Sequence, residues 1–417
     1  MDTTNRIVEL ALLIANKTFM INNFLVEKGL PTLSLDADAP RFPPIPDRDN
    51  MEYTRNCVIE ACTELRALMT GPRDLLRFNW TSHSSAKVIL HFKLDKSFPV
   101  GESTSFKAMS KFSGLSEKNV QRVIRHAITH HYLFQEKTSG VITHSSLTAI
   151  LSRDDAARNS LIVELDEIWP AAVKMADALE KWPDSEECNE TAFNLVNNTN
   201  KSMYEILAED PIRRERFEHY LSQPDISDDN VFFEIPWEDR STMVQVGGSY
   251  HKIAIGVAQQ FPNMKCFVQD LPDAIARAES QFPADLRDGV TFMVHDFINT
   301  PQPLSVDIYI FRSTMDNLAD NDCIKILRNL IPALKKGATI IVYERISPDL
   351  PRSGYHTEYS RRDTNFDMGM AQLLNKPQRT WDMWHTLFNQ IDSRFEYICA
   401  TRPNGSMYSF VEFVWDR

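Results

Sequence analysis

The hydrophobic pattern of the chain changes character near its middle. Up to about residue 225, apolar residues recur at intervals of three and four, as in Ile7, Leu10 and Ile14, which is typical of amphipathic helices. From about residue 242 onward, short apolar runs such as 243–246 and 265–269 alternate with helical patterns. Such alternation predicts a parallel sheet with right-handed crossovers. We therefore expect a mainly helical half followed by an α/β half.

A compact motif stands out within the helical half, between residues 103 and 150. A helix and a turn are followed by a second helix that Ser116 would cap, and then by two short strands around Ser139-Gly140. This order predicts a winged helix. Winged helices bind DNA or serve as packing modules. The net charge of −12 favours packing and argues against a nucleic acid or an anionic membrane as partner.

Length and composition indicate a globular protein of several domains. The 417 residues are enough for two or three cores. We expect a helical region at 1–100, a winged-helix and helical linker region at 101–225, and a Rossmann-like domain at 226–417. The six cysteines show no C-x-x-C spacing and no metal site is expected. No signal peptide and no membrane span are indicated, so the expected location is cytoplasmic.

A cofactor crevice is predicted where the first two strands of the α/β half end. The first strand runs into Gly247-Gly248, and the second ends at Asp270, 23 residues after Gly247. A glycine turn lets the backbone approach a ligand, and an acid about 20 residues later can accept hydrogen bonds from ribose hydroxyls.

These segments, and others along the whole chain, resemble the plant and fungal caffeate-type O-methyltransferases, which depend on S-adenosylmethionine. The matching segments include Val246-Gly-Gly, Asp270-Leu-Pro, Val294-His-Asp-Phe297, Leu334-Lys-Lys-Gly337 and, in the helical half, Val141-Ile-Thr-His-Ser. The resemblance implies a class I methyltransferase Rossmann-like C-terminal domain. It also implies a mainly helical, winged-helix N-terminal dimerisation domain, and hence a homodimer.

The resemblance assigns the cofactor site residue by residue. It implies cofactor contacts for Gly247, Gly248, Asp270, Asp296, Phe297 and Arg312. The family's turn reads Asp-x-Gly-Gly-Gly-x-Gly, whereas this chain has Gln245 first and Ser249 and His251 in place of glycines. Side chains at such positions crowd a close backbone approach. Two alternatives stay open: a tolerant turn that still binds S-adenosylmethionine, and a turn that has lost it.

The catalytic segment also departs from the family. The family motif Leu-Arg-x-x-x-His-Asp-Trp-x-Asp corresponds to residues 311–320, where Asp316 replaces the histidine base and Asn317 the next acid. Of the two glutamates that orient the base, Glu344 is kept and Gln378 replaces the other. A carboxylate, with a reference pKa of about 3.9, suits phenol deprotonation less well than imidazole. Repulsion from Glu344 could raise the pKa of Asp316 and make it a hydrogen-bond donor.

These departures favour a fold that is kept while methyl transfer is lost or weakened. The chain resembles fungal pericyclases of the leporin and ilicicolin type, which perform Diels–Alder-like cyclisations in secondary metabolism. Such catalysis requires a substrate held in its reactive conformer and a fixed donor that polarises a carbonyl. The candidate catalytic residues are His144, Arg312, Asp316, Asn317 and Glu344. The candidate pocket walls are Phe217, Leu221, Met315, Met368, Met370 and Trp381.

The favoured hypothesis is therefore a pericyclase acting on a hydrophobic polyketide or pyridone. The alternative is an active S-adenosylmethionine-dependent O-methyltransferase acting on a phenol or hydroxypyridone. A third is a non-catalytic member that pairs with another subunit.

Overall fold

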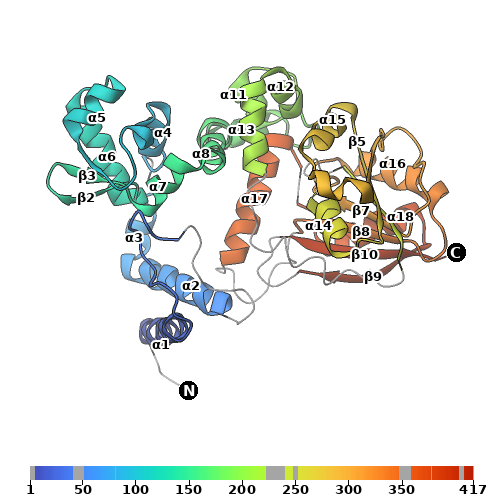
Figure 1. Cartoon of the computed structure of the whole chain (residues 1–417), viewed down its shortest axis with the longest axis horizontal. Coiled ribbons are helices and arrows are strands. Elements are labelled where there is room, and N and C mark those ends of the chain that lie inside the picture. Colours follow the sequence, from blue (N-terminus) through green and yellow to red (C-terminus); the bar gives the residue numbers. More distant parts are fainter. Residues whose placement is uncertain are drawn as a thin grey trace. The chain divides into compact units, whose positions relative to one another are not determined.

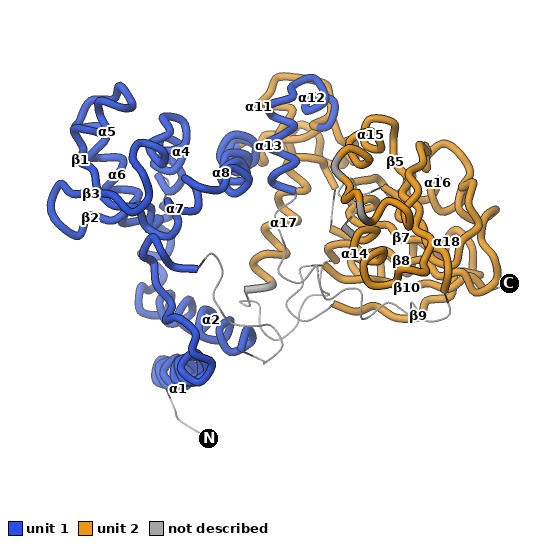
Figure 2. The backbone as a smooth tube through the Cα atoms, viewed as in Figure 1, with its two compact units in different colours: residues 1–173, 204–223, 356–358 blue, residues 174–203, 224–355, 359–417 orange. Residues whose placement is uncertain are grey.

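The chain forms two compact units, shown in Figure 2. The computed structural model describes residues 5–40, 51–79, 81–221, 240–247, 252–346, 358–376, 378–402 and 408–416. One unit comprises residues 1–173, 204–223 and 356–358, and the other comprises 174–203, 224–355 and 359–417. The expected Rossmann-like segment lies almost entirely in the second unit. That unit also includes residues 174–203 from the expected linker region.

Helices dominate the first unit. In order they are α1 (Arg6–Glu27), α2 (Met51–Thr70), α3 (Pro72–Leu75), α4 (Ser84–His91), η2 (Leu94–Lys96), α5 (Phe106–Ser113), α6 (Glu117–His131), α7 (Ser146–Arg153), α8 (Asp155–Val163), the π-helical turn η3 (Glu164–Ile168), α9 (Trp169–Val173), α12 (Met203–Glu209) and α13 (Pro211–Leu221). The strands are β1 (Ser103–Ser105), β2 (Gln135–Thr138) and β3 (Val141–Thr143).

The winged helix predicted from the sequence is confirmed. The strands form an antiparallel sheet in the order β1-β3-β2 beside α5 and α6. The hydroxyl of Ser116 accepts a hydrogen bond from the backbone N–H of Asn119 at 3.3 Å and so caps α6. Met109, Val120 and Ile124 from the two helices are fully buried in the core of this unit.

Helix α1 exposes much of its apolar surface. Only Leu10, Ile21 and Leu25 are buried, whereas the side chain of Phe19 is 67% exposed. Its 22 residues are long and apolar enough to cross a membrane, although only 11% of the most apolar stretch is buried. The sequence pattern did not indicate a segment of this kind. Core helices and signal sequences can have the same length and composition, so these two properties of α1 do not by themselves indicate a membrane.

The second unit is built on a seven-stranded sheet. Its strands are β4 (Thr242–Val246), β5 (Lys265–Asp270), β6 (Val290–Val294), β7 (Ile308–Arg312), β8 (Thr339–Glu344), β9 (Phe395–Thr401) and β10 (Ser409–Trp415). Its helices are α10 (Met175–Lys181), α11 (Ala192–Asn197), α14 (Lys252–Gln260), α15 (Pro272–Gln281), η5 (Ala284–Gly289), α16 (Asp320–Leu330), η6 (Ile331–Ala333), α17 (Glu358–Leu374) and α18 (Trp381–Ile391).

Alternating side chains of the strands supply both cores of this unit. Tyr309 and Phe311 face α16 and α18, whereas Ile308 and Ile310 face α14 and the neighbouring α15. Because successive strand residues point to opposite faces, a strand that is buried on both sides reads as one continuous apolar run. The burial of all five residues of β7 explains why its sequence, IYIFR, shows no polar alternation.

The strand order sets the position of the site. The order is β6-β5-β4-β7-β8-β10-β9, with the first five strands parallel to one another and β10 antiparallel to both its neighbours. The chain winds outward in opposite directions from the boundary between β4 and β7. In open α/β sheets, ligands bind outside the carboxyl ends of the strands at such a switch point. The α/β fold expected from the sequence is thus confirmed.

Candidate functional site

A glycine is required at the end of β4. Gly247 has a φ of +70°, and a Cβ atom there would lie 2.6 Å from Thr314 Cγ2 and 2.8 Å from Thr314 Oγ1. Its N–H donates to the carbonyl of Gln269 at 2.7 Å, and the hydroxyl of Thr314 donates to the carbonyl of Val246 at 3.0 Å. Both the left-handed conformation and the close approach exclude a side chain. Gly247 therefore joins the ends of β4, β5 and β7 at the switch point.

Gln245 closes the turn that follows. Its buried amide donates to the carbonyl of Gly247 at 3.4 Å and accepts from the N–H of Ala254, in the first turn of α14, at 3.2 Å. A carboxylate could accept the second bond but could not donate the first. Gln245 can thus hold the turn in the place of the family's acid. Gly248 and the altered positions 249–251 lie outside the described residues.

Asp270 ends β5 beside this turn. Its side chain is buried, and Oδ1 accepts a hydrogen bond from the N–H of Leu271 at 2.8 Å. Burial raises the pKa of Asp270 above its usual value because the charged form is desolvated. Hydroxyl donors from a ligand would offset that loss of hydration. The position and chemistry therefore fit an acceptor for ribose hydroxyls.

Asp296 and Phe297 follow β6, the next strand of the sheet. The carboxylate of Asp296 accepts from the backbone N–H of Asn299 at 3.1 Å and from its side-chain amide at 2.9 Å. These bonds hold the pKa of Asp296 below its usual value. Phe297 is half-buried against the core. The carboxylate of Asp296 is thus engaged within its own loop. The adenine contact implied by the resemblance stays a prediction.

Two carboxyl groups meet beyond the ends of β7 and β8. Glu344 is the last residue of β8 and is 0% exposed, whereas Asp316, in the loop after β7, is 7% exposed. One oxygen of Glu344, Oε1, accepts from the backbone N–H groups of Thr314 and Met315 at 2.9 and 3.0 Å. The two side chains interact electrostatically, and one buried oxygen of each, Asp316 Oδ1 and Glu344 Oε2, has no other hydrogen-bond partner among the described residues.

The electrostatics of this pair favour one shared proton. Burial, followed by the charge of Asp316, raises the pKa of Glu344 well above its usual value. Burial also raises the pKa of Asp316, although the hydrogen bond from Glu344 and the charges of Arg379 and Arg345 oppose that rise. Two carboxylates in contact cannot both ionise in a buried site. The raised pKa of Glu344 therefore favours its protonated form, which can donate to Asp316.

Arg379 fastens the loop that carries Asp316. Its guanidinium donates to the carbonyls of Met315 at 2.8 Å and Leu318 at 2.7 Å, and to the carboxylate of Asp320 at 2.7 and 2.9 Å. It is also stacked 4.9 Å from the ring of Trp384. Only 4% of its side chain is exposed. No motif in the sequence singles out Arg379, although it directly follows Gln378.

Gln378 has a buried side chain with no protein partner. It is 6% exposed, and neither Nε2 nor Oε1 has a hydrogen-bond partner among the described residues. Its backbone N–H donates to Asp367 at 2.7 Å, which fixes the main chain there. A buried amide that lacks partners is costly. The group is therefore available to a ligand, with one donor side and one acceptor side.

Arg312 and Asn317 are engaged within the second unit. The guanidinium of Arg312 lies 4.9 Å from the ring of Tyr408 and 5.6 Å from that of Tyr343. The amide of Asn317 donates to the carbonyl of Ser313 at 3.1 Å. Aromatic stacking and a turn bond account for these two side chains, and their assignment as substrate donors stays a prediction.

Packing also accounts for His144. It lies in the first unit, where its ring is 4.2 Å from Phe98 and 5.5 Å from Phe134, and Nε2 bonds the carbonyl of Phe98 at 3.1 Å. Burial lowers the pKa of His144 and favours the neutral ring. The N-cap of the following helix, α7, is Ser145. Its Nδ1 is buried with no hydrogen-bond partner among the described residues, and its assignment as a catalytic donor stays a prediction.

The proposed pocket walls differ in exposure. Met315 is fully buried in the core of the second unit, with Trp381 packed against the same core, and Met370 is buried. Met368 is 48% exposed and Leu221 is 49% exposed, whereas Phe217 is buried in the first unit. Met315 is thus a core residue, because its loop turns inward where Arg379 holds its carbonyl. Phe217 and Leu221 belong to the first unit, and their part in a pocket stays a prediction.

Comparison with known proteins places this geometry in a family. A family model for an O-methyltransferase domain matches residues 178–391. The O-methyltransferase AMT9 of Alternaria alternata is 34% identical over 99% of this chain and 98% of its own length. The chain belongs to the O-methyltransferase family. The O-methyltransferase pyvH of Aspergillus violaceofuscus is 32% identical over 99% of both chains.

Solved structures confirm the class I methyltransferase fold. LepI in complex with S-adenosylmethionine superposes with a TM-score of 0.72 at 19% identity, covering 88% of this chain and 95% of LepI. OxaC superposes with a TM-score of 0.76 at 17% identity, covering 99% of this chain and 100% of OxaC. At these identities, the likeness shows a shared fold.

The alternative in which the glycine turn has lost S-adenosylmethionine is not supported. Gly247 keeps the conformation that only glycine adopts readily, Gln245 links Gly247 to Ala254, and the buried carboxyl group of Asp270 ends the neighbouring strand. These residues fit S-adenosylmethionine, the cofactor of the family. Among the described residues, no group of three or more metal-binding side chains could hold an ion.

Proposed function

We propose that this enzyme binds S-adenosylmethionine at the carboxyl ends of β4 to β6 and cyclises a hydrophobic polyketide or pyridone by a pericyclic reaction. In this proposal Gly247 lets the backbone approach the cofactor and Asp270 accepts from its ribose. When bound, the cofactor would supply a positive sulfonium centre. LepI, which shares the fold, has been solved with S-adenosylmethionine, and another solved structure with this fold is described as a pericyclic reaction enzyme.

The observation that carries the proposal is the buried carboxyl pair of Asp316 and Glu344. In the family, a histidine at position 316 would take a proton from the acceptor. In this proposal Glu344 holds a proton that it shares with Asp316, and so the pair is poor at accepting another from a hydroxyl group. A pericyclic reaction transfers no proton to the enzyme. It requires only a substrate held in the reactive conformer, an effect worth up to roughly 7–11 kcal/mol, and fixed dipoles beside a carbonyl.

Gln378 supplies such a dipole in the proposal. Its amide is buried and has no partner among the described residues, and it adjoins Arg379, which holds the Asp316 loop. An amide N–H can donate to a substrate carbonyl without being deprotonated. Gln378 is therefore proposed as the group that polarises the substrate.

Methyl transfer to a phenol or hydroxypyridone is the second candidate. The names of the relatives favour it, among them the chlorophenol O-methyltransferase of Trichoderma longibrachiatum, which is 28% identical. The burial that raises the pKa of Asp316 also makes its carboxylate a stronger base than an exposed aspartate. In that case Asp316 would remove the acceptor's proton as the family's histidine does.

One experiment separates the two. Purified enzyme is incubated with S-adenosylmethionine labelled in its methyl group and with two panels, one of fungal phenols and hydroxypyridones and one of polyene-bearing pyridones. Ring-closed product of unchanged mass, without label, supports cyclisation. Labelled product formed over many turnovers would contradict cyclisation and support methyl transfer.

A matched pair of variants sharpens the result. Asp316→Asn removes the only group of the loop that could act as base, whereas Gln378→Leu removes the proposed donor and leaves the pair intact. Cyclisation requires the first variant to stay active and the second to lose rate by about 10²-fold, the effect of removing one fixed donor. Methyl transfer predicts the opposite result: Asp316→Asn should lose activity and Gln378→Leu should stay active.

We also propose that the enzyme is a homodimer formed through α1. The exposed apolar side chains of Leu12, Phe19, Met20 and Val26 support this, since an apolar face of this kind is costly in water. The wild type should run as a dimer in light scattering. Phe19→Glu should give monomers, and Lys17→Glu on the same helix should not. A monomeric wild type contradicts the proposal.

A further inference from the structure

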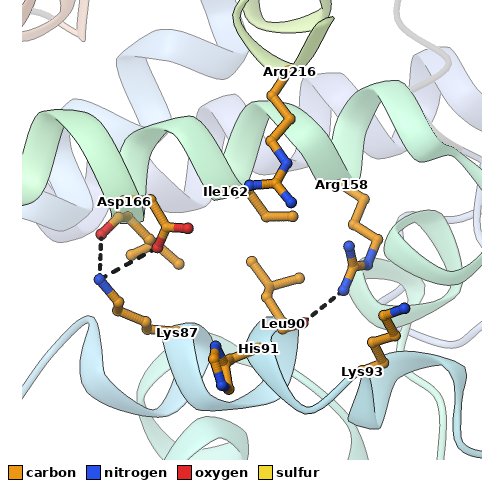
Figure 3. Close-up of a pocket in the computed structure, with 9 residues that line it drawn as sticks. Lys87, Leu90, His91, Lys93, Arg158, Ile162, Asp166 and Arg216 are labelled. Atoms are coloured by element: carbon orange, nitrogen blue, oxygen red, sulfur yellow. Dashed lines mark hydrogen bonds and ion pairs between the residues drawn. The ribbon is translucent and has the colours of Figure 1, made fainter. Parts of the chain in front are cut away.

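The first unit contains a small pocket that is unrelated to the carboxyl pair. It has a volume of about 200 Å³. Figure 3 shows it between α4 and the helical stretch of α8 and η3, with Arg216 reaching in from above. Its lining residues are Lys87, Leu90, His91, Lys93, Arg158, Ile162, Leu165, Asp166 and Arg216.

Positive charge dominates the lining. Four lysine or arginine side chains face one acid, Asp166. Two of the four have partners: Arg158 donates to the fully buried Asp95 at 2.9 Å, and Lys87 lies 3.3 Å from Asp166. Within the described chain, no acidic side chain forms an ion pair with Lys93 or Arg216. The pocket therefore carries an excess of two positive charges in a protein whose net charge is −12.

Both backbone walls of the pocket are irregular. Leu165 and Asp166 belong to the π-helical turn η3, and the carbonyl of Leu165 accepts from Lys87 at 3.2 Å. On the other wall, Lys93 has a φ of +53°, a left-handed conformation that is unusual for a lysine. π-Helical turns and strained residues gather at binding sites, where the surrounding structure maintains them.

We propose that this pocket binds an oxyanion, with a phosphate group as the ligand that fits best. A phosphate carries up to two negative charges, which match the two cations that have no acidic partner. A guanidinium such as that of Arg216 binds phosphate through two parallel N–H bonds, and Lys93 adds a point charge. Leu90, Ile162 and Leu165 also line the pocket, and their apolar side chains suit a phosphate monoester with a small apolar substituent. This site does not depend on the proposed reaction.

The test is isothermal titration of the full-length protein at low ionic strength with inorganic phosphate, with phenyl phosphate and with acetate. Millimolar or tighter binding of phosphate, and weaker binding of acetate, is expected. Tighter binding of phenyl phosphate assigns an ester as the ligand, and equal or weaker binding assigns the free ion. No binding of either phosphate overturns the proposal.

Variants locate the binding. Arg216→Gln and Lys93→Gln should each weaken phosphate binding by about tenfold, the loss expected from one charge-assisted contact. Arg214→Gln is the matched control, because Arg214 lies on the same helix, does not line the pocket and pairs with Glu218. Binding that is equally weak in all three variants, or unchanged in all three, refutes the assignment to this pocket. Circular dichroism verifies that each variant is folded.

Discussion

Replacing Glu344 by glutamine should change how the stability of the enzyme depends on pH. The glutamine keeps an oxygen for the N–H groups of Thr314 and Met315, which Glu344 now accepts at 2.9 and 3.0 Å. Its amide can donate to Asp316 in place of the shared proton. The substitution thus removes a titrating group while preserving the bonds around it.

The direction in which stability changes with pH follows from the raised pKa of Glu344. A carboxyl group whose pKa is higher in the folded state than in the unfolded state favours folding at low pH, where it is protonated in both states. That contribution falls as the pH rises from the unfolded pKa, about 4.3, through the folded pKa. Over this window the wild type should lose about 1.4 kcal/mol per pH unit from this group. The Glu344→Gln variant should not lose stability in this way as the pH rises.

The assay is urea unfolding of the wild type and the variant at a series of pH values from about 5 to about 9. The difference in unfolding free energy should shift in favour of the variant as the pH rises, and then level off. Glu396→Gln is the control, because Glu396 is an exposed carboxylate on β9 of the same unit. Parallel curves for wild type and Glu344→Gln would refute the shared proton, and with it the main physical support for the cyclase.

Three further outcomes are expected. Gly247→Ala should abolish S-adenosylmethionine binding in calorimetry and cost about 2 kcal/mol of stability, because its Cβ would meet Thr314 at 2.6 Å; unchanged binding contradicts the assigned crevice. Asp270→Asn should weaken the cofactor's Kd by about tenfold while leaving the melting temperature of the free protein within a few degrees. Arg379→Met should cost about 3 kcal/mol, because two buried carbonyls lose their donor. Arg361→Met, an exposed change on α17, should cost nothing measurable in the same urea unfolding.

The sequence by itself determined the architecture. The alternation of short apolar runs with helical patterns is a local signal, and the strands β4 and β5 lie where it placed them. Parallel strands of an α/β sheet are buried on both faces, so their apolar runs are visible without any knowledge of their partners. Gly247 and Asp270 were predictable for a related reason: each directly follows or ends a strand, and carboxyl ends of parallel strands meet at one edge of the sheet.

Only the tertiary structure decided the chemistry of the site. The proton proposed to be shared by Glu344 and Asp316 depends on the pairing of β7 with β8 and on burial of the two carboxyl groups. A local sequence pattern shows neither. Arg379 holds the Asp316 loop from a distant segment, and His144 fills a core against Phe98, because side-chain contacts follow the packing of elements far apart in the chain. Periodicity reports which face of an element is buried. The proton, charge and hydrogen-bond partners of a buried group are set by whatever the folded chain brings against it.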